Sequence, residues 1–209
     1  MQKTTFIVIA VVLAVAAAIS GAWFAARLGA PPAPPEHARL LSTPRPVPAV
    51  PALDHRGADF GRADYEGRWT IVFFGFTHCP DICPTTLNVL AGARRLLDDL
   101  PEAERPAVTM ISVDPGRDTP ERLAEYVPFF HPEFRGVHVP AQHLPELARS
   151  FGAAYAYAPL EDEDYTVDHT ASVFLVDPEA RVAGVFPTPH TAEGIATDMR
   201  RIMDLENRR

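Results

Sequence analysis

The strongest constraint on this chain is a run of 21 residues without a charged side chain near its start, residues 6–26 (FIVIAVVLAVAAAISGAWFAA). About 20 apolar residues in a helix span a bilayer, because the helix satisfies its own backbone polar groups. The alternative is a cleaved signal peptide, whose apolar core normally has about 7–15 residues. The length of the run favours a membrane anchor over residues 1–28, and its many small residues keep the signal peptide as the alternative.

The composition of the anchor also indicates a location. A mitochondrial transit peptide is Arg-rich and amphipathic, whereas residues 1–26 contain no arginine. We therefore expect a single-pass protein of a bacterial inner membrane, with its soluble part in the periplasm.

A Pro-rich segment follows the anchor. Eight of the residues in 29–51 are proline, and such a stretch has few amide donors and favours extended polyproline geometry. It predicts a semi-rigid linker that holds a domain away from the bilayer. The domain would then consist of residues 52–209.

That domain is expected to be α/β. Residues 69–76 (WTIVFFGF) form an unbroken β-branched and aromatic run, which is typical of a strand buried on both faces. Further strands are predicted at 107–113, 136–139, 171–176 and 181–186, and helices at 85–100, 119–130, 144–151 and 191–205. The last two strands form a hairpin around a tight turn. This order predicts a sheet with a parallel part and an antiparallel edge, in a thioredoxin-like topology.

Composition excludes two classes of protein. Two cysteines are too few for a disulfide-dense secreted scaffold. A net charge of −8 argues against nucleic-acid binding, which normally requires a basic patch.

Both cysteines, Cys79 and Cys83, lie between the 69–76 strand and the following helix. The helix either includes both positions, which places them on one face, or begins at Pro84 with Cys83 as its cap. In both cases the sulfurs lie near a helix N-terminus, which is expected to shift the thiols toward the thiolate. Thiolates form a disulfide or bind a soft metal such as Cu(I) or zinc. A structural disulfide or two inert core thiols is the simpler alternative.

A two-sulfur metal site usually needs a third ligand, and His169 is the candidate. It precedes the predicted 171–176 strand, in a loop that a thioredoxin-like fold places against the cysteines. Thioredoxins usually carry a cis-proline there, whereas residues 160–177 contain no proline, which weakens the plain oxidoreductase interpretation. Asp168 is a candidate to orient the ring. The alternative is that His169 is only a hydrogen-bonded loop residue.

Two carboxylates follow the second predicted strand, at the edge where α/β sheets place their sites. Asp118 either shapes the site electrostatically or pairs with Arg117 or Arg122, and Asp114 is its neighbour in the same loop. Met110 offers a thioether, but its place inside the strand predicts a core residue.

Three segments together resemble the motifs of the Sco/SenC family: FGFTHCPDICPTTL at 74–87, ISVDP with RDTP at 111–120, and VDHT at 167–170. Their order and the apolar N-terminal run also match, so the resemblance covers the anchor and nearly all of residues 53–205. It implies a thioredoxin-like fold with Cys79, Cys83 and His169 as copper ligands.

The resemblance also implies a function. Members of this family supply copper to the dinuclear copper centre of cytochrome c oxidase, with Cu(I) as the expected state and Cu(II) as a second one. The implied partners are the copper-bearing subunit of that oxidase and other periplasmic copper chaperones. The alternative is a thiol–disulfide reductase that keeps the oxidase copper-site cysteines reduced, with Cys79 and Cys83 as its catalytic pair. A peroxidase or a copper or redox sensor is a weaker hypothesis.

Overall fold

The computed structural model describes residues 2–29, 33–160 and 164–207. The chain divides into two compact units, residues 1–33 with 203–209 and residues 34–202. In the smaller unit, helix α1 covers Gln2–Gly29, and its stretch Thr5–Phe24 is long and apolar enough to cross a membrane. A signal sequence meets the same criteria, so both hypotheses for this segment stand.

The larger unit is built on a seven-stranded mixed sheet. Its strands are β1 (Arg39–Pro46), β2 (Leu53–Asp54), β3 (Thr70–Gly75), β4 (Ala107–Ser112), β5 (Arg135–His138), β8 (Val173–Val176) and β9 (Arg181–Phe186). They lie in the order β1-β9-β8-β3-β4-β5-β2. β3, β4 and β5 are parallel, whereas β8, β9, β1 and β2 pair antiparallel with their neighbours. The predicted parallel part with an antiparallel edge is confirmed.

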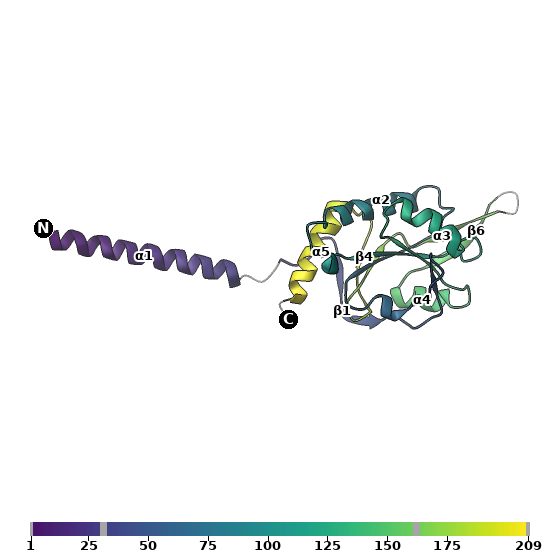
Figure 1. The fold of residues 1–209 in the computed structure, drawn as a ribbon, viewed down its shortest axis with the longest axis horizontal. Coiled ribbons are helices and arrows are strands. Elements are labelled where there is room, and N and C mark those ends of the chain that lie inside the picture. Colours follow the sequence, from purple (N-terminus) through teal and green to yellow (C-terminus); the bar gives the residue numbers. More distant parts are fainter. Residues whose placement is uncertain (1, 30–32, 161–163, 208–209) are drawn as a thin grey trace. The chain divides into compact units, whose positions relative to one another are not determined.

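Helices cover both faces of this sheet. They are α2 (Ile82–Arg95), α3 (Pro120–Tyr126), α4 (Leu144–Phe151) and α5 (Ala192–Asn207). The crossovers β3–α2–β4 and β4–α3–β5 run in the same direction along the sheet, so right-handed connections put α2 and α3 on one face. Figure 1 shows α4 on the opposite face. Two predicted helix ends are confirmed. At the start of α3, Thr119 Oγ1 accepts the Arg122 N–H, and Gly152 ends α4 with φ of 78°.

The central strand β3 determines where a site can form. All six of its residues are buried, because β8 and β4 flank it and helices cover both faces. Its carboxyl end leads directly into the segment that carries the cysteines.

The prediction of a linker is wrong for residues 39–46, which form the edge strand β1. β1 pairs with β9 at both of its ends, with an irregularity between Leu40 and Arg45. Prolines are compatible with an edge strand, because part of its backbone N–H groups face away from the sheet. Residues 30–32 of the predicted linker lie outside the described residues.

Asp198 of α5 fastens the chain at the start of β1. Its carboxylate, which is fully buried, accepts the backbone N–H groups of Glu36 (2.9 Å), His37 (2.6 Å) and Ala38 (2.7 Å). Three donors on one carboxylate replace the solvation that burial removes. The Pro-rich segment is therefore joined to the domain through a side chain 160 residues away from Ala38.

We expect Asp198→Asn to lower the free energy of unfolding by about 2 kcal/mol, because the neutral amide accepts fewer and weaker hydrogen bonds. Urea unfolding of both chains measures the difference. Glu193→Gln, an exposed acid on the same helix, is the matched control. Equal losses in both variants would contradict the role of Asp198.

The strands β6 (Tyr155–Pro159) and β7 (Tyr165–His169), which form a hairpin, were not among the predicted strands. The two strands pair antiparallel as a separate two-stranded sheet, with Tyr155 opposite His169. His169 therefore ends a strand instead of lying in a loop. Residues 161–163, which come between these two strands in the sequence, lie outside the described residues.

Candidate metal centre

The two cysteines lie at the start of α2. The helix begins at Ile82, so Cys83 is in its first turn and Cys79 precedes it. Both predicted alternatives, a helix that includes both cysteines and a start at Pro84, are therefore wrong. The Cys83 N–H donates to Cys79 Sγ at 3.3 Å. Cys79 is 9% exposed and Cys83 is fully buried, and both are free thiols.

His169 approaches this pair from β7. Its Nε2 lies 3.3 Å from Cys83 Sγ, and its Nδ1 lies 3.2 Å from the Thr170 carbonyl oxygen. Because a carbonyl oxygen only accepts, Nδ1 carries the hydrogen, and the lone pair of the neutral ring points from Nε2 toward Cys83. The Thr170 carbonyl orients the ring, whereas Asp168 is exposed.

Two phenylalanines and a glycine at the end of β3 surround Cys83 and His169. The rings of Phe73 and Phe76 each lie 5.8 Å from the imidazole centroid, at interplanar angles of 73° and 90°. Gly75 leaves space for a sulfur, since a Cβ there would lie 3.2 Å from Cys83 Sγ and 2.6 Å from a Phe73 ring carbon. Gly75 and Phe76 belong to the first motif, but all three residues were predicted only as part of the buried strand.

We expect Gly75→Ala to destabilise the domain by about 2 kcal/mol and to weaken metal binding, because the added methyl displaces a buried ring and a buried sulfur. Thermal unfolding and metal titration of the variant measure the two effects. Gly61→Ala, where a Cβ meets nothing within 4 Å, is the control. A variant with wild-type metal affinity would contradict the close fit.

The three donor atoms form one cluster. Cys79 Sγ, Cys83 Sγ and a ring nitrogen of His169 all lie within 4.8 Å of one another. Donors that share an ion at about 2.0–2.3 Å are at most about 4.6 Å apart, so the cluster fits a single ion after small adjustments. Among the described residues, this is the one group of three His, Cys, Asp or Glu side chains with such spacing.

Burial dominates the electrostatics of the metal-free cluster. It raises the pKa of the Cys83 thiol, and the neighbouring Cys79 adds to the effect. The prediction of a thiolate favoured by the helix N-terminus is therefore wrong for Cys83 in the metal-free chain, because desolvation raises its pKa more than the backbone hydrogen bond with Phe76 lowers it. Burial also lowers the pKa of His169, which keeps the ring neutral and able to bind a metal. A bound cation would favour the thiolate over the thiol, because it replaces the thiol proton.

Asp118 fastens the cysteine segment to β4. Its fully buried carboxylate accepts the Thr77 N–H (3.0 Å), the Thr77 hydroxyl (2.7 Å) and the Ser112 hydroxyl (2.7 Å). The alternative that Asp118 pairs with Arg117 is wrong, because Arg117 pairs with Asp114. Asp118 therefore acts on the site by positioning the chain two residues before Cys79.

The neighbouring Asp114 holds the hairpin that carries His169. It accepts the Tyr165 hydroxyl at 2.8 Å, and the Arg117 guanidinium lies 3.8 Å from the centre of the Tyr165 ring. Tyr157 of the same hairpin donates to the Val113 carbonyl at 3.1 Å. The cysteine segment and the hairpin that carries His169 are thus both attached to the loop that follows β4.

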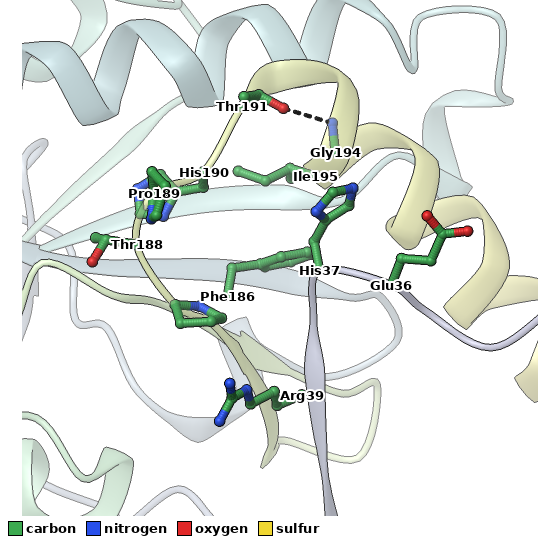
Figure 2. A pocket seen from close by; sticks show the side chains of 11 residues that line it. Glu36, His37, Arg39, Phe186, Thr188, Pro189, His190, Thr191, Gly194 and Ile195 are labelled. Carbon is green, nitrogen blue, oxygen red and sulfur yellow. Dashed lines mark hydrogen bonds between the residues drawn. The ribbon is translucent and has the colours of Figure 1, made fainter.

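The other candidates lie away from the cluster. Met110 is fully buried in the core, as predicted. A cavity of about 210 Å³, shown in Figure 2, lies between the chain that leads into β1 and the start of α5, with His37 and His190 in its wall. None of the three clustered residues lines it.

The fold and the cluster define a thioredoxin-like α/β protein whose Cys–Cys–His cluster, at the carboxyl end of its central strand, has the spacing of a metal site. The family model described as SCO1/SenC matches residues 50–204, which is most of the chain. The chain therefore belongs to the SCO1/SenC family.

Similar proteins agree with this assignment. The chain is 39% identical over 152 residues to "Protein SCO2 homolog, mitochondrial" of Bos taurus, a match that covers 72% of the chain and 57% of that protein. Among solved structures, Arabidopsis thaliana ScoI with copper bound has a TM-score of 0.69 and 32% identity, and covers 75% of this chain and 97% of that one. Bradyrhizobium japonicum ScoI with copper bound has a TM-score of 0.67 and 32% identity, and the match covers 75% of this chain and 98% of that one.

Proposed function

We propose that this chain is a membrane-anchored copper chaperone that holds copper through Cys79, Cys83 and His169 and delivers it to the dinuclear copper centre of cytochrome c oxidase. The observation that carries the proposal is the grouping of two sulfurs and one imidazole nitrogen within 4.8 Å. The family resemblance supports the oxidase as the recipient.

The donor set suits copper as cargo. Solved relatives of this family carry copper, and thiolate with imidazole ligands suits Cu(I). Structural zinc sites almost always have four protein ligands, whereas this cluster offers three. Three donors on a soft ion leave a position at which a partner's ligand can enter.

The difference in burial between the sulfurs suggests an order of transfer. Cys83 is fully buried and contacts His169, whereas Cys79 retains 9% exposure on the segment before α2. An incoming thiolate or imidazole of the partner would replace Cys79 first, while Cys83 and His169 keep the ion in place. The copper then leaves by stepwise ligand exchange without being released to water.

Copper loading and transfer of the reduced full-length chain in detergent test the proposal. A Cu(I) competition titration is expected to give one tightly bound ion per chain. Incubation with the metal-free, reduced copper-bearing domain of the oxidase is expected to move that ion to the oxidase domain. Failure to bind one Cu(I), or retention of the ion beside the acceptor, would contradict the chaperone function.

A thiol–disulfide reductase is the second candidate, and the adjacent free thiols favour it. The Cys79 thiolate would attack a disulfide sulfur of the partner, and Cys83 would then displace the partner's second thiol. The products are a Cys79–Cys83 disulfide and two partner thiols, so two electrons pass from this chain to the partner. Such a reductase needs both cysteines, and His169→Ala would leave it active while copper binding is lost.

The proposed location is the bacterial inner membrane, with the folded domain in the periplasm. The apolar helix α1 supports an anchor, and the same segment is compatible with a cleaved signal. Alkaline extraction of membranes distinguishes an anchor from a cleaved signal, because an anchored chain stays in the membrane pellet. Protease added after permeabilisation of the outer membrane would then degrade the domain only if it lies in the periplasm.

A further inference from the structure

The imidazole of His169 packs against two phenylalanine rings, one inside β3 and one directly after it. The centroids of Phe73 and Phe76 each lie 5.8 Å from the imidazole centroid, at interplanar angles of 73° and 90°. Edge-to-face contacts of this kind are favourable for aromatic rings at this separation. Phe73 is 0% exposed and Phe76 is 2% exposed, so neither ring can move aside without disturbing the packed core. The two rings therefore restrict how the imidazole can turn.

Polar contacts hold the same imidazole at both of its nitrogens. Nδ1 of His169 lies 3.2 Å from the Thr170 carbonyl oxygen, and Nε2 lies 3.3 Å from Cys83 Sγ. Phe73 also adjoins that sulfur, because a Cβ on Gly75 would lie 2.6 Å from a Phe73 ring carbon and 3.2 Å from Cys83 Sγ. The phenyl ring, the imidazole and the sulfur thus form one packed group in the metal-free chain. Donors that are held in place before an ion arrives lose less freedom when they bind it.

The two phenyl rings also form an apolar wall beside the donor cluster. They carry no hydrogen-bonding atom that could hold a water molecule, and the hydrophobic shell of a metal site controls the access of solvent to the ion. Zn(II) normally takes a fourth ligand, which is a water where the protein supplies only three donors. Cu(I) is a softer ion that thiolates bind well, and it is stable with fewer ligands. A dry wall on this side therefore affects the two ions differently.

We propose that Phe73 and Phe76 are positioning residues that determine the metal preference of the cluster, an inference that rests on the copper function proposed above. They hold the His169 ring with Nε2 toward Cys83, and they keep water away from the buried side of the ion. Cu(I) tolerates a site without a water ligand, whereas Zn(II) loses the ligand that it would take from solvent. The preference for Cu(I) over Zn(II) thus depends on side chains that donate no electrons to the ion.

Phe73→Leu and Phe76→Leu test this inference, because leucine keeps an apolar residue in the core and removes the aromatic edge beside His169. In the reduced full-length chain, each substitution is expected to lower the ratio of Cu(I) to Zn(II) affinity about tenfold. Competition with a chelator for each ion measures the two affinities. X-ray absorption of the zinc-loaded variants is expected to show an oxygen ligand in addition to those of the zinc-loaded wild type.

Phe74→Leu is the matched control. Phe74 belongs to the same strand and is fully buried, but its ring packs edge-on against Phe151 and Phe174. The substitution should cost similar stability, and any general loosening of the domain should weaken both ions alike. The ratio of Cu(I) to Zn(II) affinity is therefore expected to stay at the wild-type value.

The metal-free wild-type chain gives a second measurement, which does not depend on a variant that folds. In its NMR spectra, contacts between the ring protons of His169 and those of Phe73 and Phe76 are expected to correspond to a single imidazole orientation. An imidazole that turns freely in the wild type would overturn the inference. Wild-type affinity ratios in both leucine variants, or an equal fall in Phe74→Leu, would also overturn it. If the wild-type chain bound no Cu(I), the proposed function would fail instead, so the two failures are distinguishable.

Discussion

Replacing Cys83 by serine is expected to lower the Cu(I) affinity of the reduced chain at least about 1000-fold, which corresponds to about 4 kcal/mol. Cys83 contacts both other members of the cluster, since its backbone N–H donates to Cys79 Sγ and its own Sγ lies 3.3 Å from His169 Nε2. A serine hydroxyl is a hard ligand that keeps its proton, so it does not replace a thiolate on a soft ion. Competition against a chromophoric Cu(I) chelator measures the loss.

The neighbouring histidines supply the control for this prediction. His169→Ala removes a ligand and should also weaken binding strongly. His78→Ala removes an imidazole next to Cys79 that lies outside the cluster, and it should change the affinity less than about threefold. Similar losses in His78→Ala and His169→Ala, or an unchanged Cys83→Ser chain, would contradict the assignment of the ligands.

The second large effect is expected from Asp118→Ala. Three buried donors, the Thr77 N–H and the hydroxyls of Thr77 and Ser112, lose their acceptor together. Each buried unsatisfied group costs about 1–3 kcal/mol, so we expect a loss of about 4 kcal/mol. For a chain of this length, that lowers the midpoint of thermal unfolding by about 8–16 °C. The released Thr77 also lets Cys79 move, so Cu(I) affinity should fall in the same variant.

Asp81→Ala is the matched control for Asp118→Ala. Asp81 lies in the same segment, between the cysteines, but it is exposed, and its carboxylate accepts an exposed hydrogen bond from the Thr85 hydroxyl at 3.4 Å. Its replacement should leave the unfolding midpoint and the copper affinity close to the wild-type values. Equal effects of the two substitutions would contradict a specific role of the Asp118 hydrogen bonds.

Local sequence patterns predicted the helices and strands whose own sequence carries a clear signal. The unbroken apolar run became the fully buried β3, and Thr119 with Pro120 and Gly152 marked helix ends correctly. Elements without such a signal were missed. β1 was missed because its prolines are typical of a linker. Its position depends on pairing with β9 and on the buried Asp198, which accepts backbone N–H groups just before the strand. The β6–β7 hairpin depends on contacts with Asp114 and Val113, which belong to a distant part of the chain.

By itself, the sequence determined the chemistry that is available: two thiols four positions apart after a buried strand, and one histidine in a third motif. Only the tertiary structure decided how those groups behave. It placed Nε2 of His169 against Cys83 and positioned the cysteine segment through Asp118. It also reversed the expected direction of the Cys83 pKa, because the cost of desolvating a charge depends on burial by residues far away in the chain. Residue type and spacing are local properties, whereas burial and hydrogen-bond partners depend on the whole packed domain.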